Sequence, residues 1–71
     1  MGKRNIAQII TWKRVADGEM FTKKYSFKTA ESAIKDAEGW IIKHAKGLNR
    51  EVVKVEIIDK ETGSVVWNWE A

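Results

Sequence analysis

The chain has 71 residues, a net charge of +3, four tryptophans, and neither cysteine nor proline. A chain of this length has room for one domain, residues 1–71, and without cysteine it has no disulfide and no thiolate zinc site. No apolar run approaches the ~20 residues of a membrane span, and the N-terminus lacks the apolar stretch of a signal peptide, so we expect a soluble, cytoplasmic protein with no membrane association.

The apolar residues change their spacing twice along the chain. They alternate over residues 5–27, recur at helical spacing over residues 29–48, and alternate again over residues 51–70. The order hairpin, helix, hairpin predicts an α+β fold of ββαββ type, in which one helix packs on one face of a four-stranded antiparallel sheet.

The first hairpin is indicated by Asp17-Gly18 between two alternating runs, a pair that suits a two-residue type I′ turn. With this loop Lys23 lies opposite Trp12, and one side of the hairpin becomes the helix side. That side carries Ile6, Ile10, Trp12, Phe21, Tyr25 and Phe27. Lys23 points inward among these aromatic residues, and an inward charge protects a sheet edge. We therefore expect the second strand at an edge and the spatial strand order 2-1-3-4.

The helix is predicted to begin after Thr29, its N-cap, with Glu31 in the first turn where a negative charge suits the helix dipole. An apolar stripe at 3.6-residue spacing should face the sheet, and it consists of Ala30, Ile34, Ala37, Ile41, Ala45 and Leu48. Gly47 is the residue predicted to end the helix.

Two loops are possible in the second hairpin. A four-residue loop, residues 60–63, would place the apolar residues of its two strands on opposite faces. A three-residue loop, residues 61–63, pairs Ile57 with Trp67 on the helix side. We therefore predict the shorter loop, with Gly63 in the left-handed conformation.

The face of the sheet opposite the helix is expected to expose more apolar residues than a water-facing sheet normally does. In the predicted registers Val15 pairs with Met20, and Ile58 pairs with Val66. This pattern predicts a non-enzymatic interaction module that binds a protein partner, or itself as a homodimer, through this face or the uncharged fourth strand. The predicted partner-binding residues are Ile9, Val15, Met20, Val52, Ile58 and Val66. The plainer alternative is a set of scattered surface aliphatic residues.

Charge is unevenly distributed along the chain. Residues 1–28 hold seven basic and two acidic residues, whereas residues 51–71 hold two basic and five acidic residues. The basic first hairpin supports an alternative function, that of a nucleic-acid-binding accessory protein. Its predicted phosphate contacts are Arg4, Lys13, Lys24 and Lys28. Because most aromatic residues are expected to point inward, the sequence does not predict the stacking platform of a single-strand binder.

Catalysis is not expected. His44 is the sole histidine, and the chain has no cysteine that could complete a set of metal ligands with it. Asp59, Glu61 and Gly63 resemble the start of a calcium loop, but the glycine comes one position early for an EF-hand. We therefore predict no catalytic residue, no metal, no cofactor and no small-molecule substrate.

Two resemblances involve residues 27–33, Phe-Lys-Thr-Ala-Glu-Ser-Ala, or the order of elements around them. A strand that ends in Phe-x-Thr and enters a helix with alanine one turn on looks like the arm-type DNA-binding domains of phage integrases. Those domains have three strands before the helix, so their DNA-contacting residues are not carried over to this chain. The whole hairpin–helix–hairpin order is similar to small uncharacterised bacterial and phage proteins, including some phage-encoded anti-CRISPR inhibitors. This resemblance implies a stoichiometric inhibitor or adaptor rather than a catalyst.

Overall fold

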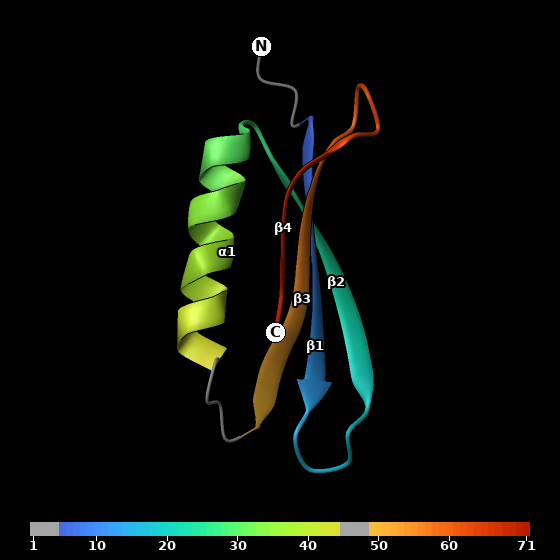
Figure 1. Cartoon of the computed structure of the whole chain (residues 1–71), viewed down its shortest axis with the longest axis vertical. Coiled ribbons are helices and arrows are strands. Elements are labelled where there is room, and N and C mark those ends of the chain that lie inside the picture. The colour runs from blue at the N-terminus through green and yellow to red at the C-terminus, as the bar shows by residue number, and fades with distance from the viewer. Residues whose placement is uncertain (1–4, 45–48) are drawn as a thin grey trace.

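The computed structural model describes residues 5–44 and 49–71. Its elements are β1 (Ile6–Arg14), β2 (Met20–Phe27), α1 (Ala30–His44), β3 (Arg50–Asp59) and β4 (Val65–Glu70). The strands form one antiparallel sheet in the order β2-β1-β3-β4, and α1 lies along one face of it (Figure 1). The predicted α+β fold and its strand order are confirmed.

The β1–β2 hairpin is closed by a four-residue loop, residues 15–18, rather than by Asp17-Gly18 alone. The amide of Arg14 donates a hydrogen bond to the carbonyl of Glu19 (2.8 Å), and the amide of Gly18 donates to the carbonyl of Arg14 (2.8 Å). A type I′ turn needs positive φ at two residues. Gly18 has a φ of 74°, but Asp17, like every other non-glycine residue in the described part of the chain, has a negative φ. The predicted two-residue turn is therefore wrong.

This loop moves the β1–β2 register by two residues. Met20 pairs with Lys13, while Val15, its predicted partner, belongs to the loop. Lys23 pairs with Ile10. Because a shift of two is even, the strand residues keep the faces predicted for them.

The β3–β4 hairpin repeats the same loop. The amide of Asp59 donates to the carbonyl of Ser64 (2.9 Å), and the amide of Gly63 donates to the carbonyl of Asp59 (2.7 Å). The loop thus contains four residues, 60–63, and the predicted three-residue loop is wrong. The left-handed conformation predicted for Gly63 is confirmed by its φ of 74°.

A β-bulge in β4 restores the pairing that the longer loop would have disturbed. Ile58 pairs with Val65 rather than with Val66, and Ile57 then pairs with Trp67 as predicted. Val66 is therefore the extra residue of the bulge. As a result both tryptophans of β4 face the helix side and pack against the core.

A second β-bulge, in β3, changes which residues face the helix. Thr11 pairs with Lys54, but Trp12 pairs with Val52, so Val53 is the extra residue. Each β3 residue that precedes the bulge therefore lies on the side opposite to the one that strict alternation predicts. Val52 is only 2% exposed and belongs to the core, so its predicted place on the open face is wrong.

Helix α1 packs mainly on β3 and β1. Its N-cap is Thr29, as predicted, because Oγ1 of Thr29 accepts a hydrogen bond from the amide of Ser32 (3.2 Å). Ala33 and Ala37 are fully buried, and their small side chains let the helix lie close to the strands. The buried core consists of Ile6, Ile10, Ala33, Ala37, Val52, Val55 and Ile57. The predicted helix residues Ala45, Gly47 and Leu48 lie outside the described ranges.

The β3 bulge is tested by the same substitution at two neighbouring positions. Val52→Ala should lower the free energy of unfolding by about 2 kcal/mol, because it removes two buried methyl groups and leaves a cavity. Val53→Ala, at the half-buried extra residue, should cost less than about 1 kcal/mol. Urea unfolding of both variants measures the difference, and a larger cost at Val53 would contradict the bulge.

Two glycines should respond to alanine in opposite directions. Gly39 is helical and a Cβ there would meet nothing within 4 Å, so Gly39→Ala should raise the free energy of unfolding by about 0.5–1 kcal/mol. Gly18→Ala should lower it by about 1 kcal/mol, because alanine is strained at a φ of 74°. Thermal unfolding followed by circular dichroism measures both, and a shift of the two melting temperatures in the same direction would count against these backbone assignments.

Candidate functional site

The structure does not gather the six predicted partner-binding residues into one patch. Ile9 and Ile58 lie half-buried on the open face, which is the face of the sheet opposite α1. Met20 is exposed at the start of β2, and Val15 is exposed in the adjacent loop. Val66 is 47% exposed at the β4 bulge. The sixth residue is buried in the core, as described above.

Charged residues separate the aliphatic side chains of the open face. The register places Ile9 between Lys24 on β2 and Glu56 on β3. Nearer the β1–β2 loop, Lys13 forms an ion pair with Glu51 across β1 and β3 (3.6 Å). The open face is therefore the ordinary solvent side of an antiparallel sheet, with aliphatic residues spaced among charges.

The predicted phosphate contacts are also dispersed. Lys13 lies near the β1–β2 loop, whereas Lys24 lies opposite Ile9, about 14 Å further along the strands. Lys28 follows the end of β2, beyond the far end of the hairpin. Arg4 lies outside the described residues. The three described lysines thus form no common patch.

The helix side of the sheet carries a column of aromatic rings and guanidinium groups near the β1–β2 loop. The rings of Trp12 and Phe21 stack with their centroids 4.5 Å apart. The guanidinium carbon of Arg14 lies 4.8 Å from the centroid of Phe21, and that of Arg50 lies 5.0 Å from the centroid of Trp12. The order Arg14, Phe21, Trp12, Arg50 is hereafter named the aromatic column. Arginine stacks well on aromatic faces and keeps its charge there.

The two arginines at the ends of the aromatic column differ in their charge partners. Nη1 of Arg14 lies 3.3 Å from Oδ2 of Asp17, and its Nη2 lies 3.7 Å from Oε2 of Glu19. Arg50 is exposed and has no ion pair within residues 5–44 and 49–71. The net positive charge of the column therefore lies at the Arg50 end.

A narrow groove with only about 10 Å³ of accessible space lies beside this end of the column, between α1 and β2. Its lining comes from four elements and defines the helix-side groove: Ile10, Trp12, Lys23, Tyr25, Trp40 and Arg50. Tyr25 is 37% exposed, and Lys23 is exposed with no ion pair in the described part of the chain. Figure 1 shows β2 curving away from the helix as it approaches the β1–β2 loop. The helix-side groove thus combines aromatic walls with two cations that no carboxylate neutralises there.

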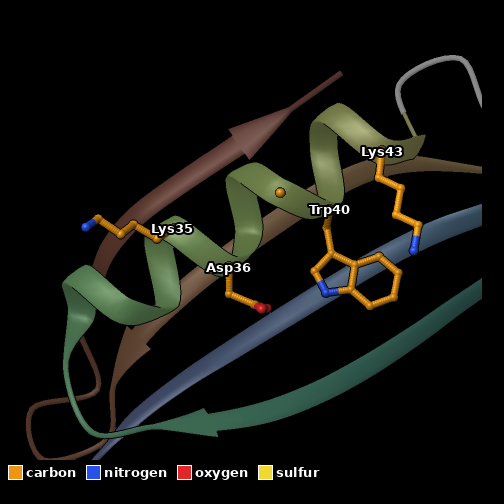
Figure 2. Close-up of a pocket in the computed structure, with 5 residues that line it drawn as sticks. Lys35, Asp36, Trp40 and Lys43 are labelled. Carbon is orange, nitrogen blue, oxygen red and sulfur yellow. The ribbon is translucent and has the colours of Figure 1, made fainter.

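A second hollow lies on the other side of Trp40. Figure 2 shows the indole projecting from α1 toward β1 and β2, with Asp36 and Lys43 on the same side and Lys35 pointing away. The carboxylate of Asp36 accepts a hydrogen bond from Nε2 of the fully buried Gln8 (3.1 Å). Trp40 is therefore a wall shared by two adjoining hollows along the flank of the helix.

The two edge strands of the sheet differ in the charged side chains that hinder pairing with a further strand. The edge strand β2 carries Lys23 and Lys24 in its middle, which discourages the addition of another strand. The edge strand β4 has no charged residue over residues 65–69, and Val65 and Val66 are each 47% exposed. Strand β4 is therefore the open edge of the sheet.

No known protein-family model, curated protein or solved structure matches the chain. The resemblances to integrase arm domains and to anti-CRISPR inhibitors, and the predicted lack of catalysis and cofactors, stay predictions. No helix in the described ranges is long and apolar enough to cross a membrane. The same residues hold no cluster of three or more histidine, cysteine, aspartate or glutamate side chains suited to a metal ion.

The helix-side groove was not predicted from the sequence, although one signal was available. A helix is about 10 Å wide, whereas four strands span about 14 Å between their axes, so an outer strand must keep part of its helix-side surface exposed. Tyr25 on β2 is such a residue. For Arg50 no signal was available, because the β3 bulge decides which side it occupies.

Proposed function

We propose that the protein is a small non-catalytic interaction module that pairs with a second copy of itself along strand β4. The observation that carries this proposal is the uncharged, exposed edge formed by β4. Unpaired main-chain groups at such an edge form hydrogen bonds with any extended strand that approaches. A second copy supplies a strand of the same length and pattern. Two identical strands that pair antiparallel are related by a two-fold axis, so the assembly ends at a dimer.

The side chains of β4 favour antiparallel pairing centred on Asn68. This register places Trp67 beside Trp69 of the second copy, on the helix side of a continuous sheet. Both tryptophans are half-buried in one copy, so the contact would bury the ring surface that each still exposes. Glu70 would lie beside Val66 of the second copy, so no two like charges meet across the pair.

A lysine at the centre of β4 should prevent this association. In the Asn68→Lys variant two ammonium groups would face each other across the symmetry axis, and we expect association at least about tenfold weaker than that of the wild type. Asn68 is exposed, so the fold of a single copy should be unaffected. Sedimentation equilibrium over a range of protein concentrations measures the association constant.

Thr22→Lys is the matched control, because Thr22 is an exposed residue on the opposite edge strand. We expect this variant to associate as the wild type does. A wild type that stays monomeric throughout the concentration range, or equal weakening by both lysine substitutions, would overturn pairing along β4.

A further inference from the structure

We propose that the first residues of β3 exchange between two registers against β1, and that this exchange is a charge switch between the two faces of the sheet. One register is the bulged arrangement of the structure, in which Trp12 pairs with Val52 and Val53 is the extra residue. The other is a regular ladder, in which Val53 takes the place of Val52 opposite Trp12. The register of β3 with β4 begins only at Lys54, so the exchange is independent of pairing along β4.

The core tolerates this slip because valine occupies both positions. A slip of one residue normally moves an apolar side chain out of the core and brings a polar one in. Here it exchanges Val52, which is 2% exposed, for Val53, which is half-buried at the extra position. The two side chains have the same volume and shape, so the core position opposite Trp12 is filled in either register. The apolar core therefore discriminates little between the two registers.

The ion pairs of the two registers are also similar. In the bulged register Glu51 forms an ion pair with Lys13 on the open face (3.6 Å), and both side chains are 41% exposed. In the regular register Glu51 would lie opposite Arg14 on the helix side. Arg14 is exposed and already lies close to Asp17 and Glu19. Because exposed ion pairs contribute little to stability, neither pairing of Glu51 fixes the register.

Two opposing interactions decide which register predominates. The bulged register places the guanidinium carbon of Arg50 5.0 Å from the ring centroid of Trp12, a contact that the regular register loses. The regular register recovers main-chain hydrogen bonds that a bulge interrupts. Each is a single weak interaction, so we expect the bulged register to predominate and the regular register to be populated at about 1–10%.

The exchange reverses the charge beside the aromatic column. In the bulged register Arg50 lies on the helix side and Glu51 lies on the open face. Because side chains alternate along a strand, the regular register exchanges the faces of these two residues. Their charge on the helix side then changes from positive to negative. An acidic partner on that side favours the bulged register and a basic partner favours the regular one, each by the difference in its affinity for the two states.

The test is nuclear magnetic resonance relaxation dispersion on the full chain, which detects exchange on the microsecond to millisecond timescale. Val52→Ala removes methyl groups from the core in the bulged register alone, so it should raise the ratio of regular to bulged register at least about tenfold. Nuclear Overhauser contacts from Trp12 to residue 53 should then appear. Val53→Ala is the matched control, because it removes the same groups from the core in the regular register alone and should abolish the exchange.

A second variant tests the charges without changing the core. Lys13→Glu places two carboxylates opposite each other in the bulged register alone, so it should raise the same ratio about two- to fivefold. Lys24→Glu makes the same change of charge on the open face, but it lies opposite Ile9 and should leave the ratio unchanged. Spectra at two protein concentrations separate the register exchange, which does not depend on concentration, from self-association.

Either of two results would refute the switch. One is the absence of dispersion in the wild type together with a Val52→Ala variant in which Trp12 still contacts residue 52. The other is an equal response of the ratio to Lys13→Glu and Lys24→Glu. If Val52→Ala does not fold, the two glutamate variants decide, because both substitutions lie outside the core. Flat dispersion in Lys13→Glu and in the wild type would then refute the proposal.

Discussion

The single extra residue at Val53 decides more of this structure than any other local feature. Side chains alternate along a strand, so one inserted residue reverses the face of each residue on one side of it. Val52 consequently enters the core opposite Trp12, and Arg50 comes to lie over the ring of Trp12. Glu51 moves to the open face, where it meets Lys13. The core near the β1–β2 loop, the aromatic column and the open-face ion pair all depend on this bulge.

The bulge changes which charges meet across β1 and β3. Without it Thr11 would still pair with Lys54, but Arg14 would pair with Glu51 on the helix side. With it Glu51 pairs with Lys13 on the open face, and Arg50 lies opposite Arg14 on the helix side. A bulge interrupts the hydrogen-bond ladder, but here the carbonyl of Val53 accepts a hydrogen bond from the amide of Ala71 (3.0 Å). The carbonyl of the extra residue is therefore hydrogen-bonded on the β4 side.

The order of elements, the strand order and the N-cap were predictable from the sequence because each depends on local spacing or on one residue type. The bulges were not, because a bulge is favourable only through contacts with another strand. In β4 the pairing of Ile57 with Trp67 was predicted correctly although the predicted loop was one residue too short. The longer loop shifts the register of β4 by one residue, and the extra residue Val66 shifts it back. In β3 nothing cancels the extra residue, so Val52 was misplaced and Arg50 was overlooked. The errors at Val52 and Arg50 therefore follow from one extra residue, which reverses the faces of the β3 residues before it. The element order and the strand order do not depend on that residue, so they were predicted correctly.

The position of the single helix explains why the surfaces available for binding lie at the flanks of the sheet. Two fully buried alanines, Ala33 and Ala37, bring α1 down onto β3 and β1, the two central strands. One helix cannot also cover the outer strands, which lie about 14 Å apart. On the β2 side this leaves aromatic rings that the helix does not cover, with exposed cations beside them, and on the β4 side it leaves half-buried tryptophans next to an open main-chain edge. Because these two flanks lie on opposite sides of the helix, a contact made at one of them leaves the other uncovered.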